Sequence, residues 1–473
     1  MSKEQEQKLL ATLYDRLQDI VTYNPSEGRE AQFEKGKTLV QFAKNEAIDP
    51  AEYDNAVSPS NPNGLANTAE AFSRLIDSVP AAQGVHASTE KSVDTNYGTI
   101  VNGANSTEQP DPVALENYGK AYDYLYAIAT IKDFTGAEQT VTNETPRYTN
   151  YKLKKSAYYK ALSAYRIAFN NYDLIQVKDQ REWQANAPAL EATLDNAWSD
   201  FRSGDASYIE QAIQVMDTSI NSAVRNVLEE AKKTYATTSL PSNIPGTPNW
   251  HQSYATPNNW SSESGTDNFT ELVLKSGNLN KTESSEFSSY GAGANWSGGL
   301  WSVGGDVSGS SGETKSHMDS DDFELSMKIA VVQVERPWLN GEIFTMKGWN
   351  LGAGFPAGSI SDGTLKDTMN KSMALITTGL VVARDIQIKC DFSTEDKTHV
   401  ESSVSGSTSV GWGPFKISGH YSHSSSKDTF NSTYENGVLK IPGMQILGYV
   451  NWIVPNSPPL SVGVKAAAGN TAE

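Results

Sequence analysis

Histidine, cysteine and acidic residues could do chemistry in this 473-residue chain, but their spacing argues against a reactive site. The six histidines never fall at metal-ligand spacing, and no HExxH pattern occurs. They are His86, His251, His317, His399, His420 and His423. The acidic run at 319–322 lacks the glycine and the distal glutamate of a calcium loop, so we interpret it as an exposed turn. We therefore predict no catalytic, metal or cofactor site, and no enzyme activity.

Other reactive motifs are equally absent from the sequence. Cys390 is the single cysteine, which excludes an intrachain disulfide and a cysteine metal cluster, and we interpret it as a small core residue. Gly352 and Gly354 lack the strand–helix frame of a dinucleotide site, and no Gly-x-Ser-x-Gly elbow occurs. The net charge of −18 argues against nucleic acid and against electrostatic attraction to anionic lipid.

Two Ser/Gly/Thr-rich stretches, 284–311 and 401–426, have the strict alternation of long β-hairpins. Their arms of about 10–12 residues approach the ~9–11 that a tilted strand needs to cross a bilayer. One small or apolar face and one hydroxyl face are typical of a strand between lipid and a water-filled lumen. The apolar face predicted to contact a membrane or another subunit comprises Tyr290, Trp296, Trp301, Val303 and Val307 in the first hairpin, and Val404, Val410, Trp412, Phe415, Ile417 and Tyr421 in the second.

The two hairpins also resemble each other. Residues 299–311 align without gaps on 413–425, with glycines and serines repeated at equivalent places. Trp301 falls on Phe415 and Val303 on Ile417, so the apolar character is kept. We interpret this as an internal duplication of one hairpin unit. Surface hairpins, fibre-like sheets and strands stacked between subunits share this composition and remain open alternatives.

Around the hairpins, the sequence predicts an α+β fold in successive parts. Residues 1–237 have helical stripes of three-and-four spacing and are expected to form an antiparallel helical bundle. A Pro/Ser/Asn-rich linker follows at 238–265, then an antiparallel β domain at 266–460 and a tail at 461–473. Strands are expected at 269–275, 323–335, 379–390 and 438–454, so that each hairpin lies between two strands.

The β half resembles a family of uncharacterised bacterial and fungal hypothetical proteins. The likeness rests on the motifs ERPWLN at 335–340, VVARD at 381–385, VGWGPF at 410–415 and IPGMQILG at 441–448. That resemblance implies no function. Four strands bearing two long hairpins also resemble the architecture of the membrane-attack-complex/perforin and cholesterol-dependent cytolysin pore formers.

We predict an oligomerising, membrane-active protein whose paired hairpins from several subunits build a β-barrel. The runner-up is a structural protein that builds a filament or tube by adding strands between neighbours, and both close exposed sheet edges across subunits. A third possibility is a sugar- or lipid-binding module that uses Trp250, Trp260 and Trp338. The expected partners are further copies of the chain and a lipid membrane.

The expected localisation follows from the absence of targeting patterns. No run of about 18 apolar residues predicts a transmembrane helix, and the N-terminus lacks the basic start and apolar core of a signal peptide. We expect synthesis in the cytoplasm and release to act extracellularly or at a membrane.

Overall fold

A computed structural model shows an α+β fold, which confirms the predicted class. It describes residues 3–23, 32–106, 112–132, 138–174, 176–219, 223–278, 300–303, 319–352, 354–392, 409–424 and 428–460. The helices are α1 (Lys3–Thr22), α2 (Ala66–Leu75), α3 (Val93–Gly103), α4 (Pro112–Leu125), α5 (Pro146–Phe169), α6 (Val177–Phe201), α7 (Ala206–Ser219) and α8 (Val224–Thr237).

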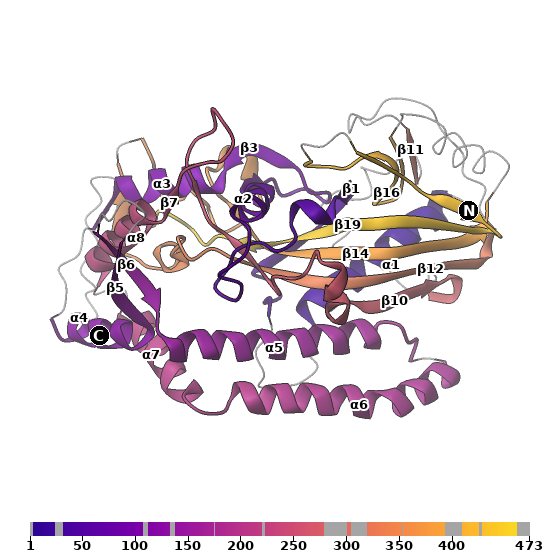
Figure 1. The fold of residues 1–473 in the computed structure, drawn as a ribbon, viewed down its shortest axis with the longest axis horizontal. Helices are drawn as coiled ribbons and strands as arrows, with labels where there is room; N and C mark the ends of the chain where they lie inside the picture. Colours follow the sequence, from indigo (N-terminus) through magenta and orange to yellow (C-terminus); the bar gives the residue numbers. More distant parts are fainter. Residues whose placement is uncertain are drawn as a thin grey trace, which may run out of the picture.

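One antiparallel sheet runs along the molecule (Figure 1). Its order is β1 (Thr38–Ile48), β19 (Val438–Ile453), β14 (Leu375–Asp391), β12 (Asp319–Glu335) and β10 (Thr270–Lys275). The short strands β9 (Tyr254–Thr256) and β18 (Thr433–Glu435) pair with β12 and β19. The middle strands carry continuous apolar runs, at 329–332 and 380–383, because both faces of the sheet are covered there.

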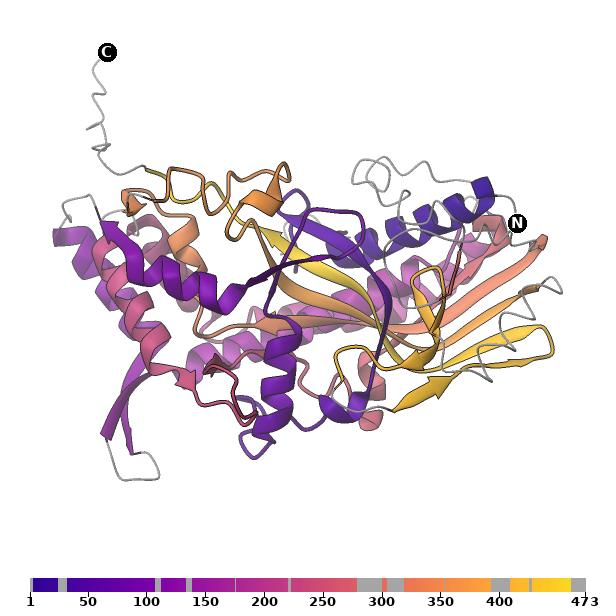
Figure 2. The same cartoon turned by 90° about the horizontal axis from the view of Figure 1, so that it is seen from above.

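The two faces of the sheet bury different cores. On one face, Leu325, Val381 and Ile388 join a cluster with the apolar stripe of α1, which lies over the sheet in Figure 2. On the other face, Val332 and Val382 pack with Phe72 of α2 and with Trp260. Successive strand residues point to opposite faces, so each strand serves both cores.

The helical end of the molecule has an aromatic core of its own. Helices α3, α4, α7 and α8 gather at one end of the sheet, and the long α5–α6 pair runs alongside it (Figure 1). The rings of Tyr118, Tyr122, Tyr126, Tyr148 and Tyr151 follow one another at centroid separations of 4.8 to 6.3 Å. Because this ladder and its neighbours form a buried cluster with Trp338 and Trp349, we interpret the tyrosines as core.

Short two-stranded ribbons complete the described part of the fold. They are β2 (Ser78–Pro80) with β3 (Ser88–Ser92), β4 (Ala104–Ser106) with β13 (Trp349–Leu351), β5 (Tyr126–Lys132) with β6 (Glu138–Glu144), and β7 (Ser239–Leu240) with β8 (Trp250–His251). A 3-10 turn, η1 (Pro50–Glu52), follows β1.

The N-terminal half differs from the helical bundle expected over 1–237. It supplies β1, whose residues pair with the last strand from Thr38 opposite Trp452 to Ile48 opposite Met444. It also supplies β2 to β6, and α1 packs on the central sheet rather than within a bundle. Strand β1 lacks a clean alternation because most of its residues are buried on both faces, so its pattern did not identify it as a strand.

Candidate functional site

Two long segments leave the sheet at the same end. The first insert, residues 276–318, connects β10 to β12, and the second insert, residues 392–437, connects β14 to β19. Because neighbouring strands are antiparallel, four strand termini lie together at one end of the sheet. They are the end of β10, the start of β12, the end of β14 and the start of β19. The segment between β12 and β14 crosses at the opposite end. Both inserts contain the predicted hairpins.

The described parts of the two inserts pair with each other. They form a four-stranded sheet in the order β11 (Trp301–Val303), β15 (Val410–Trp412), β16 (Phe415–His420) and β17 (Thr429–Asn431). Trp412 lies opposite Trp301 on one side and opposite Phe415 on the other. Since Trp301 and Phe415 are equivalent in the sequence repeat, β15 is flanked by two copies of the same strand. We call these four strands the insert sheet.

Most predicted contact residues that the structure describes face the protein core. Trp301, Val410, Trp412, Phe415 and Ile417 are all buried in the cluster shared with α1 and the central sheet. Tyr421 is half-buried and stacks on Phe430 at 5.3 Å between ring centroids, and Val303 pairs with Val410. The remaining residues, Tyr290, Trp296, Val307 and Val404, lie outside the described residues.

The opposite face of β16 is buried as well. Lys416 and Ser418, expected on a water-facing side, are 8% and 0% exposed. Both side-chain amide atoms of Gln445, in β19, bond the backbone of Lys416: Oε1 accepts from its N–H at 2.8 Å, and Nε2 donates to its carbonyl at 2.7 Å. An alternating pattern shows that one face is apolar, but it does not say what covers either face.

The second insert is fastened to β1 by a group of contacts that we call the latch. Strand β1 bulges at residues 43–45, and the Asn45 N–H donates to the Pro414 carbonyl at 2.9 Å. Ser422 donates its backbone N–H to the Ala47 carbonyl at 2.6 Å and its hydroxyl to the Asn45 carbonyl at 3.2 Å. Ser424 Oγ donates to Glu52 Oε1 at 2.6 Å.

Close approach at Gly411 brings the first insert into the same junction. A Cβ atom at Gly411 would overlap the Asn45 side chain and lie 2.7 Å from Ser302 Oγ. Asn45 Nδ2 in turn donates to Ser302 Oγ at 3.1 Å. A side chain at position 411 would have to displace the side chains of Asn45 and Ser302, so the bulge of β1 contacts both inserts at one point.

A half-buried carboxylate, Glu46, supports the latch electrostatically. Glu46 Oε2 lies 3.3 Å from His423 Nε2 and accepts a hydrogen bond from Tyr449 Oη at 2.6 Å. Burial acts to raise the pKa of Glu46, but the hydrogen bond and charge of His423, with the charge of His86, lower it overall. The His86 ring stacks on the Tyr449 ring with 3.6 Å between the ring centroids. Burial lowers the pKa of His86 to about 4.

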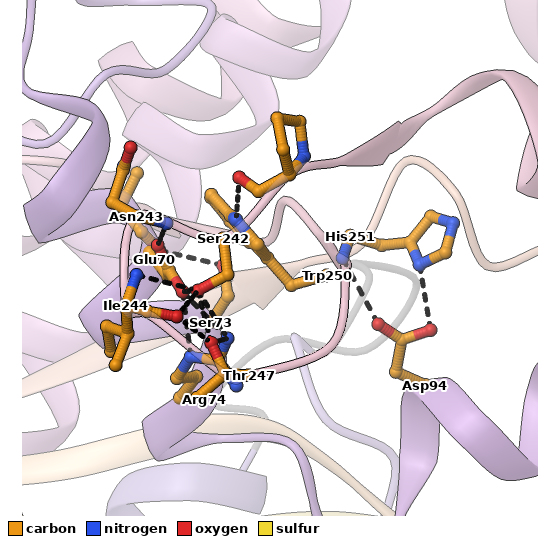
Figure 3. A network of polar contacts seen from close by, with 12 residues as sticks. Glu70, Ser73, Arg74, Asp94, Ser242, Asn243, Ile244, Thr247, Trp250 and His251 are labelled. Atoms are coloured by element: carbon orange, nitrogen blue, oxygen red, sulfur yellow. Dashed lines mark hydrogen bonds and ion pairs between the residues drawn. The ribbon is translucent and has the colours of Figure 1, made fainter.

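A second carboxylate–histidine pair lies in a polar cavity of about 750 Å³ at the helical end (Figure 3). Nδ1 of His251 lies 2.8 Å from Asp94 Oδ1, and Nε2 lies 2.7 Å from the carbonyl oxygen of Tyr235. The Tyr235 carbonyl can only accept, so Nε2 donates to it while Nδ1 faces the Asp94 carboxylate. The Asp94 carboxylate also accepts hydrogen bonds from the Tyr235 hydroxyl at 2.9 Å and from the backbone N–H of His251 at 3.1 Å.

The adjoining network in Figure 3 is also closed on itself. The carboxylate of Glu70, in α2, accepts from Arg74 and Ser242 and from the backbone N–H of Asn243. Although burial acts to raise the pKa of Glu70, these hydrogen bonds lower it. Because the polar groups satisfy one another, we interpret both networks as clamps between α2, α3, α8 and the loop at 239–251 rather than as reactive sites.

The aromatic residues considered for a sugar site are buried in this fold. Trp250, Trp260 and Trp338 are 5%, 1% and 2% exposed, and Trp338 Nε1 donates to Ser253 Oγ at 3.3 Å. Trp250 and Trp338 line the cavity that holds Asp94 and His251, whereas Trp260 belongs to the core with Phe72.

Among the described residues, no group of three or more His, Cys, Asp or Glu side chains could hold a metal ion. A search of the same residues for a helix long and apolar enough to cross a membrane finds none. Comparisons of the chain with family models, with curated proteins and with solved structures give no match.

Proposed function

We propose that this chain is an oligomerising, membrane-active protein of the pore-forming kind, whose two inserts leave the sheet and build a β-barrel together with those of other subunits. One observation carries the proposal: two related, hairpin-forming inserts emerge from the same end of one antiparallel sheet. Extending β10, β12, β14 and β19 past that end would turn each insert into a continuation of two neighbouring strands.

The resting fold holds the inserts with considerable free energy. Burial of a side chain such as Trp412, Phe415 or Ile417 contributes roughly 1.5–3 kcal/mol each. The latch adds hydrogen bonds worth about 0.5–1.5 kcal/mol each. Spontaneous release is therefore rare, and a membrane or neighbouring subunits must offset a cost on the order of 10 kcal/mol.

The first experiment is electron microscopy of the purified protein with and without liposomes, together with release of an encapsulated dye. Rings that form only on lipid and coincide with dye release are the expected result. Tubes that form without lipid would favour the structural filament instead. A protein that stays monomeric in both conditions would contradict both functions.

A reversible lock tests whether the inserts must move. Asn45 and Ser302 contact each other through their side chains, so Asn45→Cys with Ser302→Cys, in a Cys390→Ser background, should fasten the first insert to β1 when oxidised. We expect the oxidised protein to release no dye and reduction to restore release. The matched controls are the two single-cysteine proteins in the same background, which cannot form the bond and should release dye under oxidising and reducing conditions alike. Equal dye release from the locked and reduced proteins would contradict the proposal.

The lock is a cleaner test than a charged substitution on the apolar face. A lysine near mid-bilayer costs about 2–4 kcal/mol per subunit. However, Val410 is also buried in the resting fold, so Val410→Lys would disturb both states.

A further inference from the structure

The cavity beside Asp94 and His251 lies at the helical end of the molecule, away from the two inserts (Figure 1). Its volume of about 750 Å³ falls within the roughly 300–1,000 Å³ of small-molecule sites. Its walls come from α2, α3, the last turn of α8, the segment at 239–253 and Trp338. The two clamps account for only part of this lining, so the remaining side chains are available to a ligand.

Helix α3 turns a hydroxyl and amide face toward the cavity. Thr95, Thr99 and Asn102 follow one another at spacings of four and three, so they share one side of the helix. All three are exposed. Asn102 Nδ2 donates to the Gly98 carbonyl at 2.8 Å, which leaves Asn102 Oδ1 to accept from a ligand. The Thr99 hydroxyl donates to the Thr95 carbonyl at 3.1 Å and keeps its lone pairs as acceptors.

Aromatic side chains form the facing wall. Trp250 Nε1 donates to the Pro241 carbonyl at 3.3 Å, and Trp338 Nε1 donates to Ser253 Oγ at 3.3 Å (Figure 3). Because their N–H groups are already bonded, the two indoles present carbon atoms to the cavity. A saccharide ring has C–H groups on its faces and hydroxyl groups around its edge. Such a ring therefore matches a cavity with one aromatic wall and one hydroxyl and amide wall.

The charged side chains of the lining already have partners within the protein. Arg74 is paired with Glu70 at 2.7 Å, and Asp94 faces the imidazole described above. Asp77 accepts a hydrogen bond from the Asp94 backbone N–H at 2.8 Å. Burial raises the pKa of Asp77, and the charge of Asp94 acts in the same direction, whereas the charge of Arg336 opposes it. Internal pairing of this kind favours a neutral, hydroxyl-rich ligand over an ion.

We infer that this cavity binds a saccharide, with the sugar ring against the aromatic wall and its hydroxyl groups bonded to Thr99, Asn102 and Asp77. Trp250 and Trp338, two of the residues from which the sequence suggests a sugar site, both line it. The site goes beyond the proposed function, because it uses no residue of either insert and needs no movement of them.

The first test measures binding directly. Saturation-transfer difference NMR of the whole chain is recorded with free glucose, galactose, mannose and N-acetylglucosamine, and the same protein is applied to an array of immobilised oligosaccharides. We expect binding of at least one sugar, and the two arms distinguish a free sugar from a glycan on a carrier. Choline chloride serves as a small cationic probe. Binding of choline without any sugar, or no binding in either sugar arm, would overturn the inference.

The second test locates the bound sugar. Thr99→Arg fills the cavity from an exposed helical position that arginine tolerates well, and we expect affinity to fall about tenfold or more. Asn102→Ala removes only an amide and should weaken binding several-fold. The matched control is Thr193→Arg in α6, because the Thr193 hydroxyl also bonds the carbonyl four residues before it and is also exposed. Equal binding by Thr99→Arg and Thr193→Arg, with unchanged circular dichroism, would place the sugar elsewhere and overturn the assignment.

Discussion

Two carboxylate–histidine pairs, Asp94–His251 and Glu46–His423, use the same chemistry for opposite purposes. The first joins atoms 2.8 Å apart with a histidine side chain that is 5% exposed, and the second joins atoms 3.3 Å apart with a side chain that is 43% exposed. His251 bonds through both ring nitrogens inside a closed network, whereas His423 lies at the surface of a segment that pairs with β1. The comparison teaches that burial of the histidine decides whether such an ion pair stabilises the fold strongly or can break at little cost.

Removing Asp94, the carboxylate of the pair whose histidine is buried, should have the largest effect. Asp94→Ala removes the shared acceptor of the Tyr235 hydroxyl, His251 Nδ1 and the His251 backbone N–H, and each group left unsatisfied typically costs about 1–3 kcal/mol. We expect a loss of that size in the free energy of unfolding from chemical denaturation. Asp94→Asn is the conservative comparison, since it keeps one acceptor. A loss below ~1 kcal/mol for Asp94→Ala would show that this pair is no clamp.

Acid should loosen the latch, because His86 and Glu46 lie beside it. Burial lowers the pKa of His86 from 6.5 to about 4, so between these values the unfolded chain binds the extra proton. The stability from neutral His86 is thus complete above pH 6.5 and falls as the pH drops through about 4, by up to roughly 3 kcal/mol. Glu46 acts in the same direction, because its lowered pKa contributes stability that protonation removes.

Limited proteolysis across this pH range would test that expectation. Cleavage near 414–424 should increase as the pH falls, while the helical end stays protected. His86→Phe keeps the ring stacked on Tyr449 but cannot titrate, so its profile should be flatter. Identical profiles for both proteins would exclude His86 as the titrating group.

A methyl group at Gly411 should disturb the latch by steric overlap alone. Gly411→Ala places a Cβ atom against Asn45 and Ser302, and overpacking of this kind costs about 1–3 kcal/mol. We expect faster hydrogen exchange in β11, β15 and β16, with unchanged exchange in β12 and β14. Gly277→Ala, whose Cβ would meet no atom within 4 Å and whose backbone is not left-handed, controls for the general effect of replacing a glycine in an insert. Matching exchange in both variants would contradict the close approach.

We expect the smallest effect at the Glu46–His423 pair, whose histidine is partly exposed. His423→Ala removes a partly exposed ion pair, so the free energy of unfolding should change by less than about 1 kcal/mol. Thermal and urea denaturation would measure it beside Asp94→Ala. If His423→Ala lowered the free energy of unfolding as much as Asp94→Ala does, burial would not distinguish the two ion pairs.

The sequence predicts the strands of the central sheet better than their surroundings. Continuous apolar runs identify β12 and β14, and the motif-rich segment at 438–454 corresponds to β19. Strand β1 was missed, because its bulge at 43–45 interrupts the period and its residues are buried on both sides. A propensity argument cannot find a strand whose partner lies at the other end of the chain.

The sequence locates the residues of the candidate site along the chain, but it does not predict what those residues contact in the fold. Alternation identified Trp412, Phe415 and Ile417 as one apolar face, yet a face turned to lipid and a face turned to a protein core give the same pattern. Asn45 and Gln445 carry contacts that hold the inserts. Single amide residues leave no periodic signal, so only the folded chain identifies them.

The pairing of β1 with β19 also governs the order in which this chain can fold. Thr38 lies opposite Trp452, so β1 can pair with β19 only after the ribosome has made a distant part of the chain. Until then a nascent chain must carry β1 unpaired, together with the apolar stripe of α1 that packs over the finished sheet. Contacts between such distant residues slow folding, because a long loop must be ordered before they form. Pairing of β1 with β19 is therefore expected to be a late step in the folding of this chain.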